Sequence, residues 1–273
     1  MAPAGGPLLL VGCGKMGGAL LGGWRADGLP AGNVVVVEPA PALAAEIQAE
    51  HGVSVVAGPD AIPGGFAPRA IILAIKPQMM ADALPAYRAL ARSGAVVISI
   101  AAGITLARFA AAFGDDVAIV RAMPNTPAAI RRGTSALIAN HIVSQAQRAL
   151  SEQLLTAVGA IHWIDDEAQM HAITAMSGGG PAYVFLLIET LARAGIANGL
   201  PPALAAGLAR ETVTGSGALA EASPEPPEVL RRNVTSPGGT TEAALEELMA
   251  ADGIQPLFDR AIAAAARRSE ELG

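Results

Sequence analysis

Short, continuous apolar runs alternate with helical patterns along the first part of the chain. The runs are rich in Val, Ile and Leu and lack polar alternation, which is typical of strands with both sheet faces covered. Strands are predicted at 7–12, 33–38, 70–75, 95–100 and 117–122, with two more at 134–139 and 161–164. Helices are predicted between them at 17–27, 41–51, 80–92 and 144–158. This order predicts an α/β fold with a doubly wound, Rossmann-type parallel sheet.

The pattern changes after Trp163, where strand-like runs give way to helical stretches separated by Gly and Pro. The predicted helices are 181–194, 202–222, 241–251 and 256–272. Pro181 and Pro256 suit first helical turns, because the missing N–H is not needed there. We therefore expect two domains, a sheet domain over 1–165 and an all-helical domain over 166–273.

Composition and charge narrow the class of protein. Of the 273 residues 52% are hydrophobic, yet there is no run of about 18 uncharged apolar residues that would suit a membrane span. Lys15 and several glycines interrupt the apolar N-terminal stretch, which lacks the pattern of a targeting segment. A formal net charge of -6 disfavours a nucleic-acid partner, which would favour a basic face. We expect neither a membrane nor a nucleic-acid partner.

Cysteine and histidine usage points away from disulfides and metals. Cys13 is the single cysteine, so an intramolecular disulfide and a cysteine-built metal site are excluded. The four histidines are scattered without ligand spacing, and we expect no metal centre. A chain of this kind suits a reducing compartment, so we expect a cytoplasmic protein.

A G-x-G-x-x-G motif lies between the first predicted strand and the first helix: Gly12, Cys13, Gly14, Lys15, Met16 and Gly17. In a dinucleotide-binding fold the first glycine makes a tight turn, the second admits the pyrophosphate, and the third lets helix and strand pack closely. The alternative is a glycine-rich turn used only for packing. Glu38 favours the cofactor, because it ends the second strand 24 residues after Gly14 (38 − 14), where an acid accepts ribose hydroxyl groups.

Two further loops follow predicted strands, at the edge where doubly wound sheets bind ligands. After the third strand come Ala74, Ile75, Lys76 and Pro77, and after the fourth come Ala101 and Ala102. Lys76 either orients the cofactor or attracts a carboxylate, or it is a solvated loop lysine. Asn125, in the turn Met123–Pro127, either walls the pocket or caps the turn.

A second chemical candidate is the loop from Asn233 to Thr241, which enters a helix. Hydroxyl groups, backbone N–H groups and a helix N-terminus together suit a small carboxylate. The residues alone favour the other reading, an elaborate helix cap, because Ser and Thr are common there.

The order of these motifs, with Ser177–Tyr183 between them, resembles that of pyrroline-5-carboxylate reductases from Gly12 to Thr241. The resemblance implies a Rossmann domain, a helical domain that dimerises by interleaving, and dimers able to assemble further. It implies NAD(P)H-dependent reduction of a cyclic imino acid, 1-pyrroline-5-carboxylate, to L-proline, the last step of proline biosynthesis. The chain departs from the family pattern at two positions. Members usually carry Ser at the position of Gly179, and the family signature prefers a polar residue at the position of Met249.

The resemblance assigns roles within the loop from Asn233 to Thr241. Substrate is expected at Asn233, Ser236, Gly238, Gly239 and Thr241, with the carboxylate on the N–H groups of Ser236, Gly238 and Gly239. Thr241 and Lys76 are the expected catalytic residues, Thr241 at the ring nitrogen. Cofactor is expected at Gly12–Gly17, Glu38, Ala74–Pro77, Ala101 and Ala102.

NADH is the expected cofactor, with NADPH possible. A carboxylate at Glu38 repels a 2′-phosphate, and no Lys or Arg occurs between Glu38 and Arg69, so Lys15 is the one nearby cation. The rival readings are a reductase of another cyclic imine, a β-hydroxyacid dehydrogenase and a sensor that binds cofactor without turnover. The dehydrogenase typically needs a lysine on a helix after the sheet, and the chain has only Lys15 and Lys76.

Overall fold

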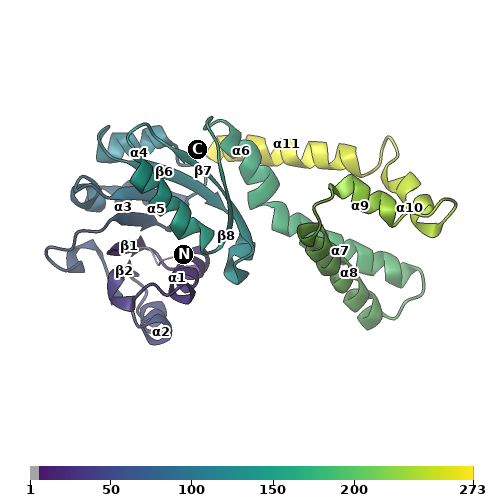
Figure 1. The fold of residues 1–273 in the computed structure, drawn as a ribbon, viewed down its shortest axis with the longest axis horizontal. Coiled ribbons are helices and arrows are strands. Elements are labelled where there is room, and N and C mark those ends of the chain that lie inside the picture. The colour runs from purple at the N-terminus through teal and green to yellow at the C-terminus, as the bar shows by residue number, and fades with distance from the viewer. Residues whose placement is uncertain (1–5, 273) are drawn as a thin grey trace. The chain divides into compact units, whose positions relative to one another are not determined.

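In the computed structural model, which describes residues 6–272, the first part of the chain forms an eight-stranded sheet (Figure 1). The strand order is β3-β2-β1-β4-β5-β6-β7-β8. The strands are β1 (Leu8–Val11), β2 (Val34–Val37), β3 (Ser54–Val56), β4 (Ala70–Leu73), β5 (Val96–Ser99), β6 (Ile119–Pro124), β7 (Gly133–Ala139) and β8 (Gly159–Trp163). The carboxyl ends of β1, β4 and β5 therefore share one edge of the sheet, because these strands are parallel neighbours.

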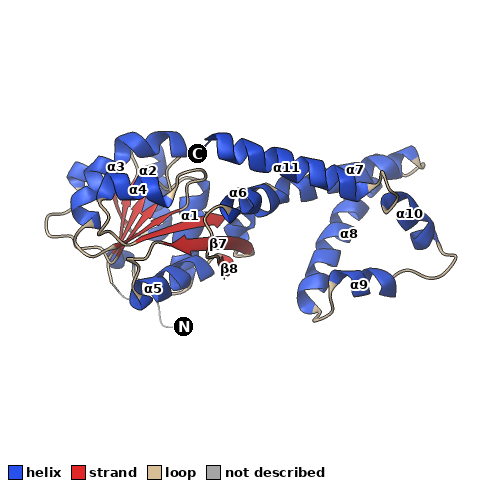
Figure 2. Cartoon of the chain, turned by 90° about the horizontal axis from the view of Figure 1, so that it is seen from above, coloured by secondary structure: helices blue, strands red, loops and turns tan. Residues whose placement is uncertain are grey.

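Helices cover both faces of this sheet, and its two largest apolar cores lie on opposite faces. The first face packs against α1 (Lys15–Ala26), α2 (Pro41–His51) and α5 (Gln145–Thr156). The second packs against α3 (Pro77–Ala91) and α4 (Leu106–Phe113). Figure 2 shows α4 and α5 on opposite sides of the red strands. Successive strand residues alternate between the cores, which explains why the strands are apolar throughout rather than alternating.

The sheet is parallel, as predicted, except at one pairing. β7 runs antiparallel to β6, and the turn between them contains only the short helix η3 (Thr126–Ile130). A parallel pair needs a crossover of a dozen or more residues, whereas so short a connection reverses the chain. β8 then pairs parallel to β7 after the crossover helix α5.

The described residues after Trp163 contain helices and no strand, as predicted. They are α6 (Gln169–Ile173), the π-helical turn η4 (Thr174–Gly178), α7 (Gly180–Ala197), α8 (Pro202–Ala222), α9 (Pro227–Asn233), α10 (Thr240–Leu248) and α11 (Ile254–Leu272). By contacts the chain divides between Gly178 and Gly179, and the segment from Ala266 onward groups with the sheet unit. The expected α/β architecture followed by helices is thus confirmed.

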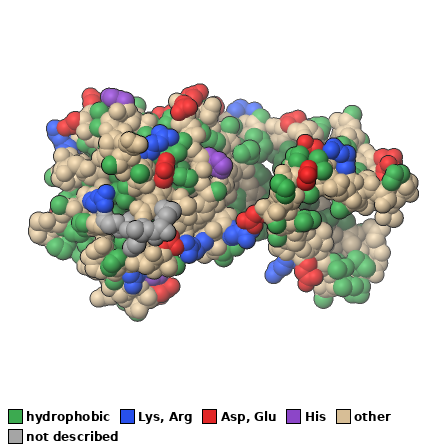
Figure 3. All heavy atoms as spheres, in the orientation of Figure 1, with side chains coloured by type: hydrophobic (Ala, Val, Ile, Leu, Met, Phe, Trp, Pro, Cys, Tyr) green, Lys and Arg blue, Asp and Glu red, His purple; other side chains and the backbone are tan. Residues whose placement is uncertain are grey.

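The helical unit carries many apolar side chains at its surface. Phe185, Leu186 and Leu187 on α7 are 58%, 54% and 44% exposed, and Leu204, Leu208 and Leu219 on α8 are also exposed. Green side chains lie on the surface of the α7–α8 pair in the space-filling view (Figure 3). Within the described residues one helical stretch, Gln169–Ala197, also has the length and apolar composition of a membrane span. Exposed large apolar side chains gathered on one pair of helices are typical of an interaction site.

Candidate functional site

The three glycines of the loop after β1 have different steric surroundings. Gly12 has a φ of 84°, and a Cβ there would lie 2.7 Å from the Cγ2 of Ile75. A Cβ at Gly17 would overlap the carbonyl oxygen of Gly12, so glycine is needed for α1 to approach β1. A Cβ at Gly14 would meet no atom within 4 Å. The loop is therefore tight everywhere except where a pyrophosphate would approach it, which fits a dinucleotide.

Glu38 is held rigidly beside this loop. Its side chain is 8% exposed, its Oε2 accepts the N–H of Cys13 at 3.1 Å, and its Oε1 accepts the N–H of Ala40 at 3.1 Å. Its own N–H donates to the carbonyl of Val56 at 2.9 Å, which ties the end of β2 to β3. The carboxylate thus has a fixed position at the carboxyl edge of the sheet, with lone pairs left for further donors.

Cys13 is a buried thiol within the glycine loop. Burial, together with the negative charges of Glu38 and Glu50, raises the pKa of Cys13 to about 11. The thiol therefore stays protonated near neutral pH and is a poor nucleophile. Cys13 acts as a small apolar residue whose N–H orients Glu38.

The loops after β4 and β5 reach the same edge as the glycine loop. The N–H of Ala74 donates to the carbonyl of Val11 at 2.8 Å, which fixes the β4 end against β1. Lys76 is exposed and stands directly before α3, whose first residue is Pro77. Ala101 is held by a hydrogen bond from its N–H to the Ser99 hydroxyl at 3.3 Å. The two loops are thus neighbours on one rim of the sheet. They comprise Ala74, Ile75, Lys76 and Pro77 after β4, and Ala101 and Ala102 after β5.

Sequence reasoning missed a buried ion pair behind this rim. Arg121 on β6 is 3% exposed, and its Nη1 lies 2.8 Å from the Oε1 of Glu167. The same oxygen accepts the N–H of Leu106 at 2.9 Å, at the start of α4. Glu167 therefore anchors both the strand and the helix that follows the Ala101 loop. No spacing rule reveals a pair 46 residues apart.

Asn125 bridges two segments through its side-chain amide. Its Oδ1 accepts the N–H of Thr134 at 2.9 Å, and its Nδ2 donates to the carbonyl of Ser177 at 3.3 Å. Asn125 thus ties the β6–β7 turn to the π-helical turn that precedes α7. It has a structural role in holding the turn.

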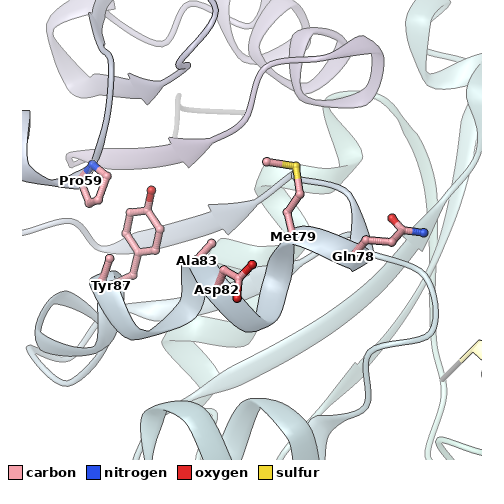
Figure 4. A pocket seen from close by; sticks show the side chains of 7 residues that line it. Pro59, Gln78, Met79, Asp82, Ala83 and Tyr87 are labelled. Carbon is pink, nitrogen blue, oxygen red and sulfur yellow. The ribbon is translucent and has the colours of Figure 1, made fainter.

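A shallow pocket lies beside α3. Figure 4 shows Pro59 opposite the ring of Tyr87, with Met79 and Gln78 toward the start of the helix. Burial raises the pKa of Tyr87 to about 12, so its hydroxyl stays protonated. None of the predicted cofactor residues lines this pocket, so it is not part of the predicted cofactor site.

The loop between α9 and α10 is a tight turn with its own hydrogen bonds. Gly238 has a φ of 70°, which favours glycine, and the N–H of Gly239 donates to the carbonyl of Ser236 at 3.0 Å. Asn233 ends α9, and Thr241 lies in the first turn of α10. The residues predicted to bind substrate therefore share one turn and one helix N-terminus.

Glu242 is a further member of this loop that sequence reasoning missed. Its Oε2 accepts the N–H of Gly238 at 2.6 Å. The sequence carried one signal for this contact. An acid at the third position of a helix often accepts a backbone N–H from the residues just before the helix. One N–H that was expected to bind the substrate carboxylate thus already has a carboxylate acceptor.

The fold, the glycine loop and Glu38 define a Rossmann-type oxidoreductase that uses a nicotinamide dinucleotide. Two family models match the chain: "NADP oxidoreductase coenzyme F420-dependent" over residues 8–103 and "Pyrroline-5-carboxylate reductase dimerisation" over residues 167–272. A pyrroline-5-carboxylate reductase from Pseudomonas aeruginosa is 41% identical, covering 97% of this chain and 96% of that protein. The chain belongs to the pyrroline-5-carboxylate reductase family, whose members are NAD(P)-dependent oxidoreductases acting on a C=N bond.

Solved structures agree with this assignment. A pyrroline-5-carboxylate reductase from Coxiella burnetii matches with a TM-score of 0.92 and 32% identity, covering 98% of each chain. A pyrroline carboxylate reductase from Plasmodium falciparum, determined with NADP bound, matches with a TM-score of 0.81 and 29% identity, also covering 98% of each. The predicted family, fold class and enzyme class are confirmed, and the dimerisation domain supports self-association.

Proposed function

We propose that the rim of the sheet binds the nicotinamide cofactor and that the loop from Asn233 to Thr241 binds the imino acid. The family reaction is reduction of the C=N bond of 1-pyrroline-5-carboxylate to L-proline, the last step of proline biosynthesis. The observation that carries the cofactor half is the fit of the glycine loop, where only the position of Gly14 is open. The cofactor, when bound, supplies the hydride.

On the cofactor side, the chain contributes position and charge rather than covalent chemistry. The N–H groups at the start of α1 face the position proposed for the pyrophosphate, and the helix dipole favours its negative charge. Side-chain-poor backbone at Ala101 and Ala102 leaves room for the nicotinamide end. Lys76, exposed at the start of α3, is our assignment for the cation that orients the cofactor or attracts the substrate carboxylate.

On the substrate side, Ser236 and the turn after it are assigned to the carboxylate. The start of α10 provides N–H groups without helical partners, and Ser236 adds a hydroxyl group. Asn233 ends α9 at the opposite side of the same turn. Thr241 is assigned to the ring nitrogen, where its hydroxyl can hold the proton that the nitrogen gains. This leaves catalysis to positioning and desolvation.

We further propose that NADH is the preferred cofactor. Both Glu38 oxygens accept backbone N–H groups, so the carboxylate cannot turn away from a 2′-phosphate without breaking those bonds. At a surface-like dielectric, we expect the repulsion to cost about 1–3 kcal/mol, or roughly ten- to hundred-fold in affinity. NADPH remains a poorer cofactor, and Lys15, exposed on the glycine loop, is the cation available to it.

Our proposal for the quaternary structure is an interleaved dimer formed through the helical unit, in the cytoplasm. The exposed apolar residues of α7 and α8 support it, because a partner helix would remove them from water. The family model over residues 167–272, described as a dimerisation domain, covers the same helices.

Rival substrates test the proposal. Oxidation of NADH should depend on 1-pyrroline-5-carboxylate, and pyrroline-2-carboxylate and β-hydroxy acids should react more slowly or not at all. A faster reaction with a hydroxy acid would favour a dehydrogenase. Cofactor binding without oxidation by any of them would favour a sensor. The lysine positions weigh against the dehydrogenase, because Lys15 begins α1 and Lys76 directly precedes α3, both in the sheet unit rather than on a helix after the sheet.

A further inference from the structure

The substrate loop holds a carboxylate of its own. The Glu242 Oε2 accepts the Gly238 N–H at 2.6 Å. Glu242 also lies in the first turn of α10, where the helix dipole favours negative charge. An acid of the chain thus occupies a donor that is assigned to the substrate carboxylate.

The contact differs from an ordinary capping box. In that arrangement the acid at the third helical position reaches back to the N–H of the capping residue. Here the capping residue is Gly239, and its N–H donates to the Ser236 carbonyl instead. Glu242 reaches one residue further, to the N–H of Gly238, whose φ is 70°.

We propose that Glu242 is an internal competitor for the substrate carboxylate and thereby sets the affinity of the site. The inference rests on the proposed role of the Asn233–Thr241 loop. Two carboxylates cannot share one N–H at hydrogen-bonding distance without strong repulsion, so the substrate must displace the Glu242 side chain. The apparent affinity for the substrate is then the intrinsic affinity multiplied by the fraction of molecules in which the Gly238 N–H is free.

The competition acts equally on substrate and product, because both carry the same carboxylate. It therefore weakens uniform binding, which changes KM and product inhibition rather than the hydride-transfer step. Glu242 is an affinity-determining residue under this proposal and makes no contact with the reacting carbon or nitrogen. Its consequence is easier release of L-proline.

The test is Glu242→Gln in the full-length protein, which keeps the shape and an acceptor oxygen but removes the charge. We expect the KM for 1-pyrroline-5-carboxylate and the Ki for L-proline to fall together by about three- to ten-fold, with kcat changed less than about two-fold. The KM for NADH should not move. Glu242→Ala, which removes the acceptor altogether, should lower both constants at least as far.

Two controls isolate the carboxylate. Glu246→Gln removes the same charge one turn further along α10 and should leave the KM for the imino acid unchanged. Pyrrolidine, which is proline without its carboxylate, should inhibit the wild type and Glu242→Gln equally.

An unchanged or higher KM in both Glu242 variants, with the melting temperature lowered, would show that Glu242 merely caps the helix and overturn the inference. If instead the wild type reduces the imine and neither Ser236→Ala nor Thr241→Val changes its kinetics, the proposed role of the loop is overturned. The two failures are therefore distinguishable.

Discussion

At the level of single residues, the proposed chemistry depends most on the hydroxyl group of Thr241. Thr241→Val keeps the shape of the side chain and removes only the hydroxyl. We expect kcat/KM for the imino acid to fall tens- to hundred-fold, about 2–3 kcal/mol, if the bond strengthens in the transition state. NADH affinity and the melting temperature should stay within error. Steady-state kinetics with cofactor titration check this.

The neighbouring Thr240 provides the matched control for that experiment. Thr240→Val makes the same change one residue earlier on α10, at a position assigned no contact with substrate. It should leave kcat/KM close to that of the wild type. Equal kinetics in Thr241→Val and the wild type would remove Thr241 from the mechanism.

Glu38 carries the residue-level prediction on cofactor choice. The wild type should have the higher kcat/KM with NADH, by roughly ten- to hundred-fold. Glu38→Ser combined with Ala40→Arg should reverse the preference, because it replaces a fixed negative charge with a phosphate-binding cation. Ala40→Arg alone, which keeps the carboxylate, is the matched control and should shift the ratio only partly. A clear wild-type preference for NADPH at the same salt concentration would refute the proposal.

Residues at strand ends were predictable, whereas those defined by distant partners were not. The sequence placed Glu38 correctly at the end of β2, because the motif and strand lengths fix that position. It gave no hint of the Arg121–Glu167 pair, whose members meet only in the folded chain. Glu242 carried a local signal, but a helix cap and a ligand competitor share that signal.

Among the elements, the β1–α1 loop makes a prediction that separates folding from binding. Gly17→Ala should lower the melting temperature, because its Cβ would overlap the Gly12 carbonyl oxygen. Gly14→Ala should leave the melting temperature unchanged, because its Cβ meets no protein atom within 4 Å. It should nevertheless weaken NADH binding by about ten-fold or more, since the methyl group would stand where the pyrophosphate approaches. Thermal melts and cofactor titrations of the two variants decide it.

The result that would contradict this account is a Gly14→Ala protein with wild-type cofactor affinity. The pyrophosphate would then lie elsewhere. A lower melting temperature in Gly14→Ala would instead mean that the loop is tighter than its geometry indicates.

Most elements followed from the apolar pattern, and the exceptions have physical causes. Seven of the eight strands were predicted, because buried parallel strands are apolar throughout. β3 was missed because it has only three residues at the sheet edge, with Ser54 exposed. The direction of β7 depends on the length of a turn rather than on periodicity. The π-helical turn Thr174–Gly178 has no sequence rule, since it inserts into an otherwise ordinary helical pattern.

At the scale of the whole molecule, the contact between Glu167 and Arg121 predicts where the sheet unit can be separated. A chain ending at Trp163 lacks Glu167 and leaves the buried Arg121 without that partner. A chain ending at Gly178 keeps it and should be more stable by about 1–3 kcal/mol, a range that allows for the partial exposure of Glu167. Both should bind NADH weakly and show no imine-dependent oxidation, since the substrate loop is absent. Denaturant unfolding and activity assays check this.

Glu167→Gln in the full-length chain isolates the ion pair from the effect of truncation. It should lower the free energy of unfolding, as loss of Glu167 does in the chain that ends at Trp163. Equal stability of the two shortened chains would contradict the anchoring role of Glu167.

At the same scale, a full-length protein that is active yet strictly monomeric at micromolar concentration would refute the interleaved dimer.

The measurement that tests the central claim most directly is the fate of the transferred hydride. The full-length protein is given 1-pyrroline-5-carboxylate and NADH stereospecifically deuterated at C4, once with each face labelled, and the products are analysed by mass spectrometry and NMR. The account predicts L-proline with one deuterium at the ring carbon next to nitrogen and away from the carboxylate, from one of the two labelled cofactors. Deuterium at the carbon bearing the carboxylate would indicate the isomeric imine as substrate. Unlabelled proline, or none, from both cofactors would contradict the account.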